Sequence, residues 1–399
     1  MEPQDRIGLA RLTQWAFDGV DLTPLRNQLL AQSLLHGGNG CLMDLSVIDQ
    51  LQGRREEGLK WQARALEGER VFSTNRRGQG QKRLLVFAEP SDMGGNTPIE
   101  FLLDGSGFEI LTYYPNLAAM EKAQLPDHDV AFCAVPADAP GAWAFHAGVR
   151  QLMGERPVLN LPEAPVSLDR DALGQGVGPV PGSAPGLRFP KTERLPRACV
   201  GAAEVGPMPW VIRPVGSHAG KGLERIDSPA ELTAYLERRA ESEFHVSAFI
   251  DYASPADGQF RKYRVVFVGG RAFPCHMAIA DRWDVWYLNA GMEGSTGKRR
   301  EEAAFMDGFD AGFATRHRRA LRALSSGIGL DYFGIDCAED AQGNLVVFEA
   351  DNALIVHDMD PQAIFPYKSH HMRRIFAAFE AMLHREAREN TPEAGMRRH

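Results

Sequence analysis

The stretch Y-F-G-I-D-C-A-E-D-A-Q-G-N-L-V-V-F-E-A-D-N, residues 332–352, decides the fold. Two apolar runs flank the turn D-A-Q-G-N, so the sequence predicts two strands joined as a hairpin. Glu349 and Asp351 share one strand face, and the hairpin can bring Asp336 across from them. Three converging carboxylates repel one another unless hard cations are bound, and such oxygen-rich sets suit Mg²⁺ that bridges nucleotide phosphates. The alternative, a solvated acidic face, is disfavoured because the apolar run before Glu349 indicates a buried strand.

Another predicted strand, within F-R-K-Y-R-V-V-F-V-G-G-R-A-F-P at residues 260–274, carries two cations. Lys262 and Arg264 alternate with Tyr263 and Val265, so both cations point to one face of the strand. That face must meet either solvent or an anion.

The glycine-rich stretch W-V-I-R-P-V-G-S-H-A-G-K-G-L-E-R-I, residues 210–226, does not match either familiar phosphate-binding template. A P-loop needs four residues before its Gly-Lys pair and then Ser or Thr, whereas three residues separate Gly216 from Gly220 and a glycine follows Lys221. The dinucleotide fingerprint lacks its third glycine. The loop glycines still allow backbone amides to approach an anion, and the cation of Arg213 precedes them. A hairpin with a solvated lysine is the alternative.

Bulk composition limits the classes of function. The 399 residues exceed what one core usually holds and predict two or three domains. The net charge of −8 argues against a broad surface for DNA or RNA, so we expect no nucleic-acid partner. No run approaches eighteen apolar residues and the first residues carry no secretion signal, so we expect a cytoplasmic protein without membrane contact.

The cysteines support the same expectation. Neighbouring cysteines lie more than fifty residues apart, which builds neither a zinc site nor a redox pair. An odd, sparse set is typical of a reducing cytosol, and we expect each cysteine to be a small buried hydrophobe. The five cysteines are at positions 41, 133, 199, 275 and 337.

Residues 1–75 are predicted to be a helical segment, with apolar residues at helical spacing and no strand signals before about residue 70. The part from Gly38 to Leu66 resembles one tetratricopeptide-type helical hairpin with Gly53 at its turn. One such unit cannot bury both faces alone, so it should pack on the rest of the chain or on a protein partner.

Residues 80–160 are predicted to form a small parallel α/β domain, because strand candidates alternate with helical segments. The loop S-D-M-G-G-N-T-P follows the first strand, at the edge where open α/β sheets usually bind ligands. Gly94, Gly95 and Asn96 in this loop are therefore either substrate contacts or simply a turn. The strand candidates are the run Q-K-R-L-L-V-F-A-E-P at 81–90 and the segments 109–113, 129–135 and 157–161.

Taken in chain order, these segments resemble the ATP-grasp superfamily of carboxylate–amine ligases. The resemblance covers about residues 155–385, and the α/β unit before it is similar to the small domain that usually precedes the nucleotide-binding part. It implies an α/β chain of α+β ATP-grasp architecture, with ATP and Mg²⁺ as cofactors. The implied domains are a helical segment at 1–75, the small α/β domain at 80–160 and the ATP-grasp domain at 161–390.

The resemblance also implies roles for individual residues. Asp336 and Glu349 match the two magnesium carboxylates, and Asp351 stands where the family usually has asparagine. Asn352 is the alternative third ligand if the strand bulges. The residues implied in catalysis are Arg213, Lys262 and Arg264. Those implied in nucleotide binding are Lys191, Arg213, Gly216, Ser217, His218, Gly220, Lys221 and Gly222, with the hinge residues Ala248, Phe249 and Ile250.

The implied reaction is ligation of a small-molecule or peptide carboxylate to an amine. ATP phosphorylates the carboxylate, and the amine then attacks the acyl phosphate while a closed glycine-rich loop excludes water. His218, His276 and His357 are either substrate contacts or structural residues. Two other functions stay open, a phosphotransferase acting on a small-molecule acceptor and a non-catalytic nucleotide-binding scaffold.

Overall fold

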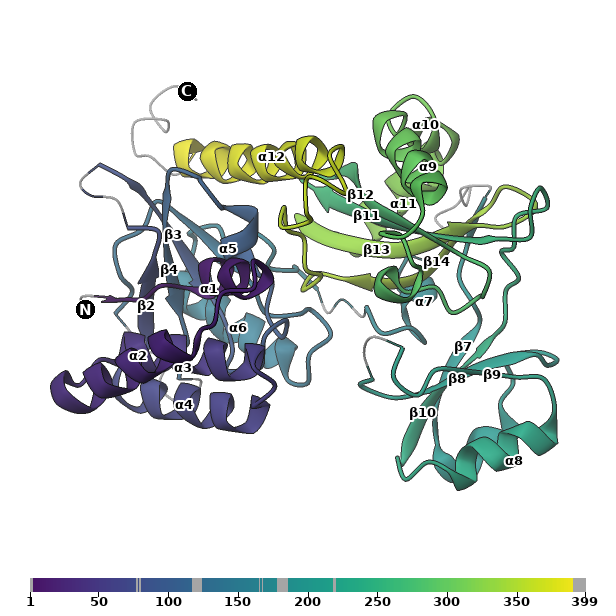
Figure 1. Ribbon diagram of the computed structural model, residues 1–399, viewed down its shortest axis with the longest axis horizontal. Coiled ribbons are helices and arrows are strands. Elements are labelled where there is room, and N and C mark those ends of the chain that lie inside the picture. The colour runs from purple at the N-terminus through teal and green to yellow at the C-terminus, as the bar shows by residue number, and fades with distance from the viewer. Residues whose placement is uncertain are drawn as a thin grey trace.

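Three β-sheets and the helices that cover them build the chain, so the prediction of an α/β protein is confirmed. Figure 1 shows the first sheet and the N-terminal helices at the left, the second sheet at the upper right and a smaller third sheet below it. The computed structural model describes residues 3–76, 78, 80–116, 124–164, 166, 168–177, 186–217 and 220–389.

The first sheet has the strand order β1-β2-β4-β3-β5 and is mixed, not purely parallel as predicted. β3, β4 and β5 run parallel, but β2 pairs antiparallel with β4, and β1 lies at the edge. The expectation that no strand precedes about residue 70 is wrong for the two-residue β1, whereas β2 begins just after that limit. β2 is buried on both faces, so no alternation of polar and apolar residues marks it. The strands are β1 (Gln4–Asp5), β2 (Val71–Thr74), β3 (Lys82–Phe87), β4 (Phe108–Tyr113) and β5 (Val130–Cys133).

Alternate residues of β3 pack on opposite layers of helices. Leu84 and Val86 share a core with α12, whereas Leu85 and Phe87 share one with α6. The core beneath α12 also contains residues of β11, so this long helix joins the first sheet to the second (Figure 1). The helices are α5 (Ile99–Leu102), α6 (Ala142–Met153) and α12 (Lys368–Glu389). The strand candidate at 157–161 makes only an isolated bridge, from Leu159 to Phe132.

The N-terminal helices pack against the first sheet, and α3 and α4 form the predicted hairpin. Gly53 lies in its turn with φ of 80°, a conformation that glycine adopts without steric cost. Apolar residues of the helices share a core with Phe72 and Tyr114 of the sheet region, so the hairpin packs on the rest of the chain. The helices are α1 (Leu9–Phe17), α2 (Thr23–His36), α3 (Asn39–Leu51) and α4 (Arg55–Gly68).

The third sheet is antiparallel, with the order β7-β10-β8-β9, and has a core of its own. Trp210, Ile212, Phe244 and Val246 point into this core, where Tyr235 of α8 covers them. The elements are β7 (Thr192–Pro196), the 3₁₀ helix η2 (Arg197–Ala202), β8 (Trp210–Pro214), β9 (Glu224–Ile226), α8 (Pro229–Glu237) and β10 (Glu243–Ala248).

The second sheet has the order β12-β11-β13-β14-β6 and is antiparallel except for the pairing of β6 with β14. Its strands are β6 (Leu187–Arg188), β11 (Phe260–Val268), β12 (Arg271–Ala280), β13 (Tyr332–Glu339) and β14 (Leu345–Asp351). The accompanying helices are α7 (Leu173–Gly176), η3 (Tyr287–Asn289), α9 (Thr296–Asp307), α10 (Phe313–Arg316) and α11 (Arg318–Ile328).

Two general expectations can be compared with this fold. In the part of the chain that the structure describes, no helix has both the length and the apolar character that a bilayer-spanning segment needs. All five cysteines are free thiols, but the expectation that each is buried is wrong for Cys199, which is exposed on η2, and for Cys41, which is half-buried.

Candidate active site

The second sheet presents a row of charged side chains on one face. Asp336 of β13 lies directly opposite Glu349 of β14, and Gly334 lies opposite Asp351, so all three carboxylates share that face. On the other side of β13, Arg264 of β11 lies opposite Asp336. Lys262, two residues before Arg264, projects from the same face.

Two of the three carboxylates form ion pairs with protein cations. Asp336 accepts hydrogen bonds from Arg264 Nε at 2.8 Å and Nη2 at 3.1 Å, and Lys262 Nζ lies 2.8 Å from its Oδ2. Glu349 pairs with Arg170, which belongs to the segment before α7. The carboxylates therefore do not simply repel one another, because cations from three segments of the chain lie among them.

The pKa values of these carboxylates follow from their partners. Burial alone would raise the pKa of Asp336, but Arg264 and Lys262 outweigh it and hold the pKa well below its ordinary value. Burial likewise opposes ionisation of Glu349, and Arg170 is the main group that brings its pKa below the usual range. Both groups are anions at neutral pH.

Asp351 differs from the other two carboxylates. Among the described residues it has no ion pair, and its Oδ1 accepts one hydrogen bond from the backbone N–H of Ala353 at 2.6 Å. Burial raises the pKa of Asp351 to about 6, with a further contribution from the neighbouring charge of Glu349. A cation bound here would therefore neutralise a carboxylate charge that no ion pair among the described residues neutralises.

Asn352 has a structural role instead of projecting toward the carboxylates. Its side-chain Oδ1 accepts a hydrogen bond from Ala137 N at 3.0 Å, and its Nδ2 donates to the carbonyl of Val135 at 3.2 Å. Its own carbonyl accepts from the Thr97 hydroxyl at 2.8 Å. The buried amide thus ties the end of β14 to the first sheet.

The charged row borders a cavity of about 140 Å³ between the second and third sheets. One part of its wall is apolar and includes Phe189, Val211 and Leu223. Another part carries Arg170, Arg213, Lys262 and Glu349. An amphipathic ligand with a flat apolar group and an anionic tail fits such a division.

The predicted hinge forms one edge of this cavity. Ser247, Ala248, Phe249 and Ile250 all line it, and Thr192 faces them from β7 with its hydroxyl 2.8 Å from that of Ser247. The N–H groups of Ala248 and Phe249 already donate to backbone carbonyls of the protein. A base bound here would therefore meet mainly the carbonyl groups of this segment.

Arg213 is placed between the cavity and the glycine-rich loop. Its Nε donates to the Ser217 hydroxyl at 3.0 Å, and its Nη2 donates to the Ser217 carbonyl. Burial, together with the nearby charge of Arg170, lowers the pKa of Arg213 to about 10. The guanidinium remains protonated at neutral pH, and an anion in the cavity would relieve the cost of burying it.

The glycines of the loop adopt the left-handed conformation. The φ values of Gly216, Gly220 and Gly222 are 73°, 71° and 72°, a region that residues with a Cβ atom rarely adopt. Gly222 is also tightly packed, because a Cβ atom there would lie 2.8 Å from the ring of Pro214. The left-handed backbone and, at Gly222, the close packing account for glycine at these positions without a bound ligand.

Of the described residues predicted to bind nucleotide, Arg213, Ala248, Phe249 and Ile250 line the cavity, whereas Lys191, Gly216, Ser217, Gly220, Lys221 and Gly222 do not. The Lys191 side chain is exposed and donates to the carbonyl of Glu204, because its neighbour Thr192 takes the face toward the cavity. Lys221 is exposed in the loop. His218 lies outside the described residues.

Sequence reasoning missed two charged residues of the site, Arg170 and Asp138. Arg170 follows a segment without regular structure, and only the fold brings it to Glu349. Asp138, in the loop after β5, lies close enough that its charge acts on Asp351, and burial raises the pKa of Asp138 itself. Their contacts join segments far apart in the chain, so no local spacing signals them.

The other histidines have separate surroundings. His276 on β12 lies opposite Arg264, and burial, helped by Arg264, lowers the pKa of this imidazole well below its usual value. His357 lies near Phe17 and Phe101 of the N-terminal half, and its Nδ1 accepts from Met359 N at 3.2 Å. His276 is therefore a neutral group beside the charged row, whereas His357 packs between aromatic rings.

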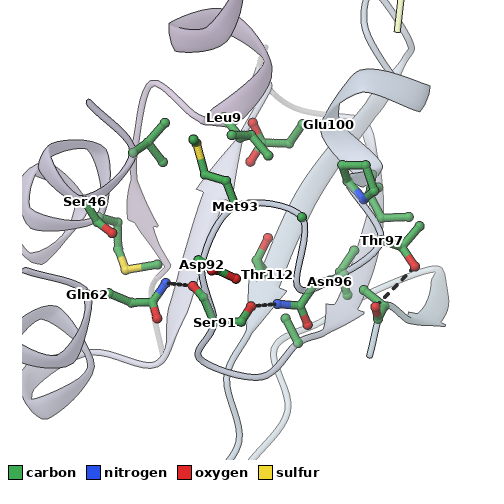
Figure 2. Close-up of a pocket in the computed structure, with 18 of the residues that line it drawn as sticks. Leu9, Ser46, Gln62, Ser91, Asp92, Met93, Asn96, Thr97, Glu100 and Thr112 are labelled. Carbon is green, nitrogen blue, oxygen red and sulfur yellow. Dashed lines mark hydrogen bonds between the residues drawn. The ribbon is translucent and has the colours of Figure 1, made fainter. Parts of the chain in front are cut away.

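A smaller pocket of about 100 Å³ lies between the N-terminal helices and the loop after β3. Figure 2 shows that Asn96 points back into this loop, where its Nδ2 donates to the Ser91 hydroxyl at 2.7 Å, and that Gln62 of α4 binds the Ser91 carbonyl. Gly94 has φ of 90°, as a turn requires. The turn therefore accounts for Asn96 and Gly94, and a substrate role for this loop stays a prediction.

The three carboxylates offer the oxygen ligands that Mg²⁺ prefers, although their oxygens do not all lie within 4.8 Å of one another in the described residues. They come from two neighbouring strands and share the face beside the cavity. The raised pKa of Asp351 indicates a carboxylate that lacks a compensating cation. Asp336, Glu349 and Asp351 are thus the residues that would hold Mg²⁺ with a nucleotide.

Comparisons with known proteins give structural similarities only. A scan of protein-family models and a search of curated proteins both found no match. Similar solved structures include a RimK domain ATP-grasp protein from Sphaerobacter thermophilus, at 17% identity and a TM-score of 0.43, covering 75% of this chain and 99% of that one. The VanG D-Ala:D-Ser ligase from Enterococcus faecalis has 14% identity, a TM-score of 0.43 and the same coverages. D-alanine–D-alanine ligase from Bacillus anthracis complexed with ATP has 16% identity and a TM-score of 0.42, covering 78% of this chain and 99% of that one.

TM-scores below 0.5 leave the residues of the site as the basis for assigning a function.

Proposed function

We propose that this chain is an ATP-dependent ligase that joins a carboxylate to an amine. The observation that carries the proposal is the cavity between the second and third sheets, with an apolar wall at the hinge and a charged row at its other end. The apolar wall suits a purine base, and the row of cations and carboxylates suits a triphosphate with a divalent metal.

The cations of the site are assigned to the phosphate groups. Arg213 is half-buried and has no carboxylate partner among the described residues, and it donates hydrogen bonds to Ser217. Lys262 lines the same cavity, and Arg264 lies beside Lys262 because both cations pair with Asp336. When Mg²⁺ is bound, it adds positive charge on the phosphate oxygens; the cations of the chain add to this by binding and orienting the same groups.

The reaction proposed is a two-step acyl transfer. A substrate carboxylate oxygen attacks the γ-phosphorus of ATP, which releases ADP and forms an acyl phosphate. The amine then attacks the acyl carbon, forms the C–N bond and releases phosphate with loss of a proton. Arg264 and Lys262 stabilise the negative charge that develops on the phosphate oxygens. The lowered pKa of His276 beside Arg264 makes this imidazole a poor proton acceptor, so the amine proton leaves to solvent.

The deciding experiment measures ADP and phosphate release together during a screen of carboxylates and amines. A ligase releases both products in equal amounts, and only when both substrates are present. ADP release with a stable phosphorylated product and no free phosphate would select a phosphotransferase. No nucleotide turnover with any substrate pair, despite ATP binding, would favour a scaffold.

The metal assignment is tested with the variant Glu349→Gln, which keeps the size of the side chain and removes its charge. Calorimetric titration with a non-hydrolysable ATP analogue should show a strong loss of Mg²⁺-dependent affinity. A matched control is Glu339→Gln, on the same strand pair but paired with Arg316. Equal affinity in Glu349→Gln and the unaltered protein would remove the assignment.

A further inference from the structure

A second group of metal-ligand side chains lies apart from the carboxylate row. One oxygen each of Asp169 and Asp171 and one imidazole nitrogen of His245 all lie within 4.8 Å of one another. Asp169 and Asp171 belong to the segment before α7, whereas His245 is in the middle of β10. The three donors therefore come from two parts of the molecule, the third sheet and a segment that packs on the second sheet.

His245 is the observation that separates this group from an ordinary acidic cluster. The residue is only 3% exposed, and its Nδ1 is buried without a hydrogen-bond partner among the described residues. Buried imidazole nitrogens are normally hydrogen-bonded, so a histidine that lies near two carboxylates and keeps an unpartnered nitrogen can take a further ligand. Asp171 Oδ1 is likewise buried and without a partner.

The charges that face His245 come from both neighbouring strands and from the loop. Arg194 of β7 and Arg213 of β8 lie opposite it in the sheet, and Arg170 lies between the two aspartates in sequence. Burial, with Arg170 next, lowers the pKa of His245 to about 4. The imidazole is thus neutral at physiological pH, and its nitrogen lone pair is available to a metal.

The two aspartates also lack full compensation. Burial raises the pKa of Asp169, and the charge of Asp171 raises it further, although Arg194 and Arg170 act in the opposite direction. Asp171 has no ion pair among the described residues. One divalent cation would neutralise both carboxylates at once.

We propose that Asp169, Asp171 and His245 form a binding site for a divalent transition metal of the Zn²⁺ type. One imidazole nitrogen and two carboxylate oxygens are ligands that Zn²⁺ accepts, and three protein ligands leave a position for water. The nitrogen ligand distinguishes this site from the carboxylate row, whose oxygens suit Mg²⁺.

Metal binding here would have a structural consequence. Leu168 and Leu173, on either side of the aspartates, belong to the core of the second sheet, whereas β10 belongs to the third sheet. A bound ion would therefore tie these two parts together beside the cavity. It would also fix Arg170, the partner of Glu349.

The test is a calorimetric titration of the full chain with Zn²⁺ alone, without nucleotide, followed by absorption spectroscopy with Co²⁺. We expect one tightly bound ion per chain and visible bands that indicate nitrogen and oxygen ligands. His245→Gln and Asp171→Asn should each weaken binding by more than the roughly 10- to 100-fold that loss of an outer-shell partner costs. Asp171→Asn serves if the buried His245 variant fails to fold.

Two control variants make the outcome specific. His146→Gln alters another buried histidine with an unpartnered nitrogen, but one with no such aspartates around it, and should bind Zn²⁺ like the unaltered protein. Glu349→Gln should also retain the site, which separates this result from the fate of the proposed ligase activity. The proposal would be overturned by no Zn²⁺ binding, by Asp171→Asn and His245→Gln variants that bind Zn²⁺ as tightly as the unaltered protein, or by loss of binding only in Glu349→Gln.

Discussion

At the level of single residues, the three carboxylates of the site differ in whether protein cations pair with them. Asp336 is engaged by Lys262 and Arg264, and Glu349 by Arg170. These ion pairs keep the buried carboxylates ionised at neutral pH, which a metal ligand requires. Their cations must share the carboxylates with an incoming ion, so they lower its affinity while they also attract phosphate. Asp351 alone keeps its charge without such a partner.

This difference predicts that Asp351 controls the pH dependence of metal binding. Its pKa is raised to about 6, so it holds a proton below that pH and must lose it to bind Mg²⁺. Mg²⁺-dependent nucleotide affinity should therefore fall as the pH decreases from about 7 to about 5. The variant Asp351→Asn should bind more weakly at neutral pH and lose this pH dependence. Titrations over the pH range decide it, and an unchanged profile in the variant would contradict the assignment.

The same shift has a consequence for stability in the absence of metal. The pKa of Asp351 is higher in the folded chain than in the unfolded chain, so its ionisation disfavours folding as the pH rises through this interval. Asp351→Asn should then raise the free energy of unfolding at neutral pH by up to about 3 kcal/mol, and have little effect near pH 4. Denaturant unfolding at the two pH values measures the difference.

Asn352 and Asp351 are neighbours with opposite expected effects. Asn352→Ala leaves the Val135 carbonyl and the Ala137 N–H without their partners, at a cost of about 1 to 3 kcal/mol in the free energy of unfolding. Asp351→Ala should leave the melting temperature unchanged or higher, and instead reduce turnover. Thermal unfolding and steady-state rates of the two variants test this. A larger loss of turnover in Asn352→Ala at unchanged stability would give the ligand role to Asn352.

At the level of elements, a β-bulge shapes the site. Asp336 pairs with Glu349, but the next residue, Cys337, pairs with Val347, so Phe348 is the extra residue of β14. Regular alternation would turn Phe348 away from the face of Glu349, yet Phe348 lines the cavity and contacts Tyr252. Because the bulge precedes Glu349, the pairing from Glu349 to Asp351 stays regular, and Asp351 shares the face of Asp336 and Glu349.

The elements also show what the sequence could and could not predict. The hairpin of β13 and β14 and the helical hairpin around Gly53 follow from local patterns of apolar residues and turns. The bulge, the antiparallel β2 and the position of Arg170 depend on contacts between segments distant in sequence. Lys191 is exposed while its neighbours Pro190 and Thr192 line the cavity, so its predicted contact with nucleotide stays a prediction.

Within the glycine-rich loop, two glycines with the same backbone conformation should respond differently to substitution. Gly220 and Gly222 have φ near 70°, so alanine costs about 1 kcal/mol of backbone strain at either position. Only at Gly222 would the added Cβ meet the Pro214 ring. We expect Gly222→Ala to raise the KM for ATP several-fold more than Gly220→Ala does, as measured by steady-state kinetics.

The control for this pair is Gly19→Ala, at a left-handed glycine with open space between α1 and α2. It should lower the melting temperature slightly and leave the KM for ATP unchanged. If Gly220→Ala and Gly222→Ala have equal effects on the KM, contact with Pro214 does not position the loop.

At the level of the whole molecule, the first and second sheets are joined far more strongly than the third. The core under α12 contains residues of both sheets, and Asn352 and Asn160 add hydrogen bonds between them. By contrast, every residue in the core of the third sheet comes from the segment between Leu195 and Val246, which we call the third-sheet lobe. Figure 1 shows this lobe apart from the others, below the second sheet. The cavity lies where the lobes meet.

This arrangement predicts that residues 192–248 open and close as a unit whose stability depends on the ligand. Without nucleotide, their amide hydrogens should exchange through an opening of lower free energy than that of β3, β4 and β13, because little shared core holds the lobe. Mg²⁺ with a non-hydrolysable ATP analogue should bridge the second and third sheets. It should slow exchange in β8 and β10 by a factor set by the ratio of the analogue concentration to its Kd. Exchange in α6, which packs on the first sheet and contributes no residue to the cavity wall, should change little and provides the internal control. Hydrogen exchange read by mass spectrometry resolves these segments. Equal protection of all three sheets in the free protein, with a uniform response to nucleotide, would mean that the lobes form one rigid body.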